Sequence, residues 1–198
     1  MSSDVRIRQA EALLEQFGWD RDHSRQVRDL AVSLFDQLQP LHELGANERD
    51  VLNAAALLHD IGWTAGRTGH HKTSYALIQQ SADRLPSFAS AEVELIAQVA
   101  RYHRKSLPAP GHAAFAELPG PQQRVVEKLA ALLRLADGLD RPHLQAVRGL
   151  YCGVTDRHVL IGVEALTDPG GHVEGAARKR DLFERVYGLP VEFSVVAP

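Results

Sequence analysis

The stretch Leu52–Gly62 constrains the chain most, because an apolar helix-forming segment ends there in an adjacent histidine and aspartate, His59 and Asp60. Placing an imidazole and a carboxylate at the end of an Ala/Leu helix costs free energy unless a partner compensates them. A divalent metal ion would compensate both groups. A buried His59–Asp60 hydrogen bond is the simpler structural alternative. We expect Gly62 to cap the helix in a left-handed conformation.

Other stretches with apolar residues at helical spacing also carry metal-capable side chains. His23 lies on the apolar stripe of a helix that Pro40 ends, and His103 lies on the inner face of a later helix. A helix over about residues 122–139 directs Asp137 inward. Buried polar groups each need a partner, and one shared divalent ion would satisfy all of these together. Mixed imidazole and carboxylate ligands suit Mn²⁺, Fe²⁺, Co²⁺, Ni²⁺ or Zn²⁺ better than Ca²⁺ or an all-oxygen Mg²⁺ site.

The pattern changes after Arg141-Pro142, where strand-like segments replace the helical spacing. The segments that follow are a strand at Leu150–Val154, a strand at His158–Val163, a charged helix over about Gly175–Tyr187 and a strand at Val191–Val196. We therefore predict a mainly α fold, with a helical domain over residues 1–144 and a small β-α-β extension over residues 145–198 packed on it. Two further segments are expected to be loops, the polar stretch Thr64–Gly69 and the proline-rich stretch Ser106–Pro121.

The charge and cysteine content exclude several partners. A net charge of −3 gives no electrostatic case for binding nucleic acid or a membrane. The single cysteine, Cys152, suits a reducing cytoplasm, and the N-terminal residues lack the apolar run of a signal peptide. We expect a cytoplasmic protein. If the chain forms a homodimer, two segments are candidates for the contacts between its copies, the strand Val191–Val196 and the proline-rich loop.

The order of these motifs resembles that of the HD-domain superfamily of metal-dependent phosphohydrolases. More narrowly, the chain is similar to the helical C-terminal domain of the exopolyphosphatase/guanosine pentaphosphate phosphohydrolase family. The stretches that carry the resemblance are Asp22–Val27, Leu57–Gly62, Gly69–Lys72, Arg101–Lys105, Leu133–Asp137, Asp140-Arg141 and Arg178–Phe183. In that family the helical domain follows an actin-like ATPase-type domain, whose Gly-rich phosphate loops this sequence lacks. We therefore expect the domain to stand alone.

The resemblance implies one or two divalent ions and identifies the residues of this chain that would bind them. It makes His23, His59, Asp60 and Asp137 the ligands of one metal, and it assigns His103 with either His70 or His71 to a second. We favour His71, because Lys72 and a helical register of apolar residues follow it. The ion itself stays open among Mn, Fe, Co, Ni, Zn and Mg.

A metal at this site implies hydrolytic chemistry, because metal-bound water has a lowered pKa and the ion screens phosphoryl oxygens. Asp60, next to a ligand, is our candidate for the base that orients the water. Phosphate also needs cationic donors. Lys72 and Lys105 are the leading candidates because each closely follows a histidine of the motif. Three arginines also flank the motifs, at positions Arg104, Arg134 and Arg141.

Three functions are compatible with these residues. The first is a metal-dependent phosphohydrolase acting on a phosphate ester or anhydride of a nucleotide or a polyphosphate-like small molecule; it predicts an open coordination position with basic residues around it. The second is a non-catalytic metal-containing module that senses a nucleotide or polyphosphate, which predicts a closed metal site. The third is an HD-type di-iron oxygenase, which predicts bound iron and a bridging carboxylate or histidine.

Overall fold

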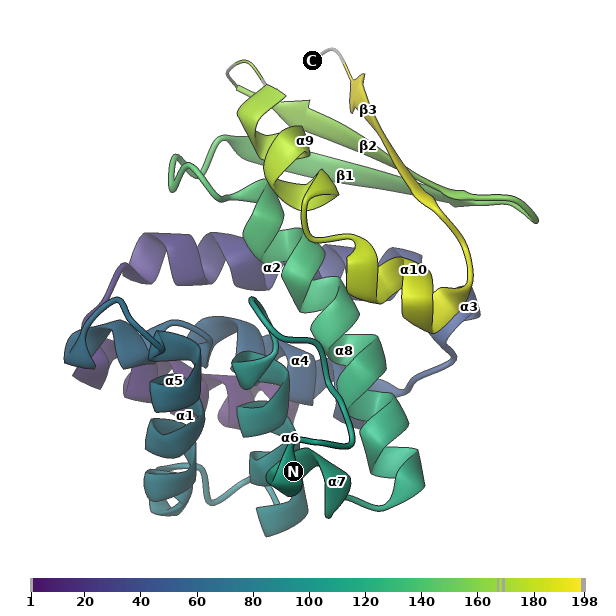
Figure 1. The fold of residues 1–198 in the computed structure, drawn as a ribbon. Helices are drawn as coiled ribbons and strands as arrows, with labels where there is room; N and C mark the ends of the chain where they lie inside the picture. Colours follow the sequence, from purple (N-terminus) through teal and green to yellow (C-terminus); the bar gives the residue numbers. More distant parts are fainter. Residues whose placement is uncertain (1, 167, 169, 197–198) are drawn as a thin grey trace.

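The structure, a computed structural model, describes residues 2–166, 168 and 170–196. Helices make up most of it (Figure 1). In chain order the helices before the first strand are α1 (Ser3–Phe17), α2 (Arg21–Gln37), α3 (Gln39–His42), α4 (Ala46–Leu58), the 3-10 helix η1 (Ile61–Ala65), α5 (His70–Gln80), the 3-10 helix η2 (Ala82–Arg84), α6 (Ser90–Arg101), α7 (Ala113–Ala116) and α8 (Gly120–Leu139). No helix of the described residues is long and apolar enough to cross a membrane.

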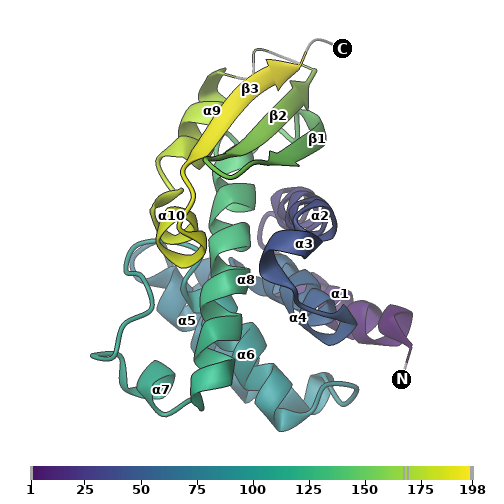
Figure 2. The ribbon, with the colours of Figure 1, turned by 90° about the vertical axis from the view of Figure 1, so that its right-hand side faces the viewer.

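Helix α8 runs through the centre of the molecule. Figure 2 shows it with α2 on one side and α10 (Asp181–Tyr187) on the other, and α4 and α6 also pack against it. Every residue from Leu129 to Leu139 is therefore buried, which requires a helix that is apolar on all sides. Two residues of this buried stretch are not apolar, Arg134 and Asp137, and their polar groups need partners inside the protein.

The C-terminal part forms a three-stranded sheet at one end of the helical body (Figures 1 and 2). Strand β2 (Val159–Ala165) pairs antiparallel with β1 (Val147–Val154) and parallel with β3 (Val191–Val196). The helix α9 (Gly170–Ala177) lies between β2 and α10 in the chain and packs on α8. The side chain of Gln37 on α2 donates to Leu150 O and accepts from Cys152 N, so α2 covers the free edge of β1.

The predicted fold class, mainly α with a small β-containing tail, is confirmed. The division at residue 144 stays a prediction. The strand at Val191–Val196 is confirmed to the residue, whereas the predicted single helix over Gly175–Tyr187 is wrong. The chain instead ends α9 at Ala177, turns through Arg178–Arg180 and starts α10 at Asp181. The loop predicted for Ser106–Pro121 contains the short helix α7 and the first two residues of α8.

Gly62 has a different role from the predicted left-handed cap, since its φ is not positive and it lies inside η1. A Cβ at this position would lie 2.1 Å from His70 O and 2.5 Å from Ser74 N. The missing side chain therefore lets the first turn of α5 approach the end of the Leu52–Gly62 stretch, and Ser74 Oγ accepts a hydrogen bond from Gly62 N at 2.9 Å. Helix α5 begins at His70.

Replacing Gly62 by alanine is expected to lower the free energy of unfolding by about 2 to 3 kcal/mol, because two packed backbones would have to separate. The matched control is Gly111→Ala, since a Cβ at Gly111 meets nothing within 4 Å. Chemical denaturation of the two variants and the wild type measures the difference. Equal stability of Gly62→Ala and Gly111→Ala would contradict the close packing of η1 on α5.

Candidate metal centre

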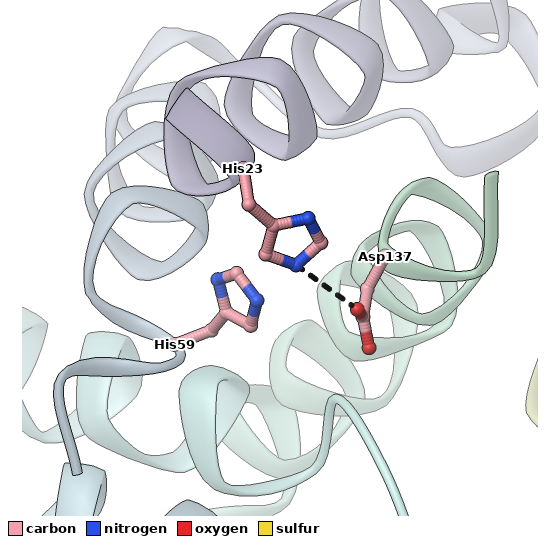
Figure 3. Close-up of side chains that lie close together, drawn as sticks. All are labelled: His23, His59 and Asp137. Atoms are coloured by element: carbon pink, nitrogen blue, oxygen red, sulfur yellow. Dashed lines mark ion pairs between the residues drawn. The ribbon is translucent and has the colours of Figure 1, made fainter. Parts of the chain in front are cut away.

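Three buried side chains from different helices meet at the first cluster of the site, defined by His23, His59 and Asp137 (Figure 3). His23 is in the first turn of α2, His59 is the C-terminal cap of α4, and Asp137 is near the end of α8. One ligand atom from each lies within 4.8 Å of the others, and His23 Nε2 is 3.5 Å from Asp137 Oδ1. The sequence-predicted convergence of these three residues is present in the structure.

A second cluster, also buried, consists of Asp60, His70 and His103. Asp60 Oδ1 lies 3.1 Å from His70 Nε2 and 3.4 Å from His103 Nε2, and the two nitrogens are 3.4 Å apart. Ligand atoms about 2.1 Å from a common ion lie roughly 3 to 3.5 Å from one another. The other oxygen of Asp60, Oδ2, is 3.6 Å from His59 Nε2, so Asp60 connects the two clusters.

All four histidines of the two clusters are oriented in the same way. Each Nδ1 is within hydrogen-bonding distance of an acceptor: Asp140 Oδ2 for His23, Ala56 O for His59, Arg67 O for His70 and Ala100 O for His103. An Nδ1–H that donates to these oxygens places the ring's lone pair on Nε2, the nitrogen that would bind a metal; in His70 this nitrogen lies 3.3 Å from Arg104 Nη1. His23 Nε2, His59 Nε2 and Asp60 Oδ1 are buried and have no hydrogen-bond partner among the described residues. Such unpaired polar atoms are costly unless an ion or water occupies the space between them.

The protonation of the site follows from its burial and its charges. Burial lowers the pKa of His59 and lowers that of His103 well below its usual value, so both rings are neutral, as metal ligands must be. Burial would raise the pKa of Asp60, but His59 and His70 lower it below its usual value. Burial opposes protonation of His23, yet the carboxylates of Asp137 and Asp140 raise its pKa to about 10. The two carboxylates therefore favour a positive charge at this position.

The second cluster and Asp137 of the first line the wall of a cavity of about 420 Å³. Asp60, His70, His103 and Asp137 all line it. So do five cationic residues, Arg67, Arg104, Lys105, Arg141 and Lys179. In the part of the chain that the structure describes, only Lys179 among the five is in an ion pair, with Asp137. The cavity therefore combines metal-capable atoms with unpaired positive charge.

Not every sequence-predicted residue lies at this cavity. His71 and Lys72 line a smaller hollow of about 90 Å³, and the cluster with Asp60 and His103 contains His70 and not His71. Burial and the cations around His71 lower its pKa to about 4. Lys105 lines the metal-capable cavity. Arg134 is buried and does not line the cavity, and its guanidinium donates to Tyr102 O and Asp181.

Four residues without a role predicted from the sequence also lie at this site. Lys179 contacts Asp137, Arg67 lines the cavity, and Asp140 holds the ring of His23. His143 also lines the cavity; its ring stacks on that of His23 with centroids 3.8 Å apart. Asp140 and Lys179 belong to stretches that carry the family resemblance, which was the only available signal for them. Arg67 and His143 are in loops without a recognisable pattern.

Comparison with known proteins gives a family and partial relatives. The family model described as Ppx/GppA phosphatase, domain III, matches residues 5–159. A protein of Aeromonas hydrophila named guanosine-5'-triphosphate,3'-diphosphate pyrophosphatase is 45% identical over 60 residues, which are 30% of this chain and 12% of that protein. A protein of the same name from Pseudoalteromonas translucida is 25% identical over 136 residues, 68% of this chain and 26% of the relative. The matched segments are thus a small part of these relatives.

Proposed function

Because the chain belongs to the Ppx/GppA phosphatase domain III family, we propose that it is a metal-dependent phosphohydrolase of the HD type. Its substrate would be a phosphate ester or anhydride of a nucleotide or a polyphosphate-like small molecule. The observation that carries the proposal is the pair of buried clusters, in which three inward-facing atoms, His23 Nε2, His59 Nε2 and Asp60 Oδ1, have no hydrogen-bond partner among the described residues. Two divalent ions would be held, one by His23, His59 and Asp137 and one by His70 and His103, with Asp60 between them.

The donor set fits such ions. Each cluster supplies imidazole and carboxylate ligands, and the hydrogen bonds at Nδ1 fix the rings with Nε2 inward. When bound, the ions would activate water near neutral pH and screen the phosphoryl oxygens. Asp60, which is ionised, would orient the attacking water. Lys105, Arg104 and Arg141 would bind the phosphoryl oxygens from the cavity wall.

The open wall of the site favours hydrolysis over a purely structural or sensing role. A closed metal site would bury its ligands away from any cavity, whereas four of the six proposed ligands line one. The cations on the same wall match a phosphorylated ligand. A di-iron oxygenase would also have a carboxylate between the two clusters, but its activity would depend on iron. The identity of the metal that supports activity therefore distinguishes an oxygenase from a phosphohydrolase.

The test is release of inorganic phosphate with Mn²⁺, Mg²⁺, Co²⁺ or Fe²⁺. Substrates to be screened are nucleotides, guanosine 5'-triphosphate 3'-diphosphate and short polyphosphates. We expect metal-dependent release that is lost in His59→Ala. The matched control is His158→Ala, because the hydrogen bonds of His158 in the β1–β2 turn are made by its backbone. Absence of release from every substrate with every ion, from a protein that binds those ions, would contradict the proposal and favour the sensing module.

A further inference from the structure

Lys179 reaches the metal-capable cavity from the C-terminal part of the chain. It lies in the turn between α9 and α10, and its Nζ donates to Asp137 Oδ2. The family model matches residues 5–159, so Lys179 is outside the matched segment. Its side chain is 16% exposed and lines the cavity together with Asp60, His70 and His103.

The position of Lys179 is fixed on both sides by contacts with α8. A Cβ on Gly175 would lie 2.2 Å from Gly138 O, and one on Gly138 would lie 2.6 Å from Ala176 Cα, so the two backbones touch. His172 Nδ1 is 2.5 Å from Leu139 O. On the other side of the turn, Asp181 accepts a hydrogen bond from the buried guanidinium of Arg134 at 2.9 Å. The turn is therefore held next to Asp137 by two glycines, the buried contact of His172 and the partly buried contact of Asp181.

The two oxygens of Asp137 face different neighbours. Oδ1 lies 3.5 Å from His23 Nε2, on the side of the first cluster, while Oδ2 accepts from Lys179. An ammonium group has three N–H donors. Asp137 is the only hydrogen-bond acceptor of Lys179 Nζ among the described residues, so two donors stay available toward the cavity.

We propose that Lys179 is a substrate-binding residue that the α9–α10 turn delivers to the site, where it donates to a phosphoryl oxygen while it orients Asp137. The inference rests on the proposed function for the identity of the ligand. A lysine that only balanced the charge of Asp137 would need neither a place on the cavity wall nor free donors. One carboxylate contact and two open donors match a group shared between a ligand residue and an anion.

The experiment measures binding of inorganic phosphate to the Mn²⁺-loaded protein by calorimetry, together with Mn²⁺ binding alone. The variants are Lys179→Ala and Lys179→Met, which keeps the hydrocarbon stem if the alanine variant does not fold. We expect roughly tenfold weaker phosphate binding, the effect of losing one charge-assisted hydrogen bond, with the number of bound Mn²⁺ ions unchanged. In steady-state assays KM should rise by a similar factor. The control is Arg178→Ala, since Arg178 is exposed and pairs with Glu174 on the surface.

Two results would overturn the assignment. Phosphate binding equal to wild type in Lys179→Met would show that Lys179 does not contact the anion. Loss of Mn²⁺ from a folded Lys179→Met variant would assign Lys179 to support of the metal ligands only. The phosphate-binding measurement needs no turnover. A wild type that binds phosphate through Lys179 but hydrolyses nothing would therefore overturn the proposed function and leave this inference standing.

Discussion

His70→Ala is expected to lower metal-dependent phosphate release at least roughly 100-fold, because losing even an outer partner of a metal ligand typically costs 10- to 100-fold. His70 Nε2 is 3.1 Å from Asp60 Oδ1, and its Nδ1 is fixed by Arg67 O. The variant would leave Asp60 and His103 without their third partner. Steady-state assays with saturating metal ion measure the loss.

His71→Ala is the matched control, because the two histidines are neighbours at the start of the same helix. His71 lines a separate hollow and belongs to neither cluster. Activity within about twofold of wild type is expected for it. A His71→Ala variant as impaired as His70→Ala would show that the second cluster is assigned to the wrong histidine.

Removal of divalent ions with a chelator is expected to destabilise the protein. Ions that bind only the folded chain stabilise it by about 2.7 kcal/mol at a free concentration 100 times Kd. Without them, the buried atoms His23 Nε2, His59 Nε2 and Asp60 Oδ1 have no partner among the described residues. Thermal unfolding of the chelated protein, before and after adding back Mn²⁺, measures the gain.

Asp137→Ala should remove most of the stabilisation by Mn²⁺, since it takes the only carboxylate from the first cluster. The quantity compared is the increase in thermal stability on adding Mn²⁺ to each protein. A general loss of stability in the variant does not affect this difference. A wild type whose unfolding is the same with chelator and with excess Mn²⁺ would contradict the ligand assignment.

The first cluster could be predicted from the sequence because helical periodicity is sufficient for it. His23, His59 and Asp137 each occupy the inward side or the end of an apolar helix, and helices that pack together bring such positions close. Periodicity does not show where a helix begins. The choice between His70 and His71 depends on the start of α5, which the close approach of Gly62 to that helix sets.

Lys179 could not be placed from the sequence for a related reason. The charged stretch Arg178–Arg180 reads as the exposed face of one continuous helix, and the break between α9 and α10 appears only once α9 packs on α8 through Gly138 and Gly175. Long-range contacts of this kind override local propensity. They decide which cations reach the cavity and which lie on the surface.

The central claim is that the two clusters bind metal, and the metal content of the purified chain tests it most directly. After reconstitution with Mn²⁺ and removal of unbound ion, inductively coupled plasma mass spectrometry gives the ions per chain. We predict two ions in the wild type and at most one in His59→Ala, which removes a ligand from the first cluster and a neighbour of Asp60. A wild type without bound metal, or a His59→Ala variant that keeps both ions, would contradict it.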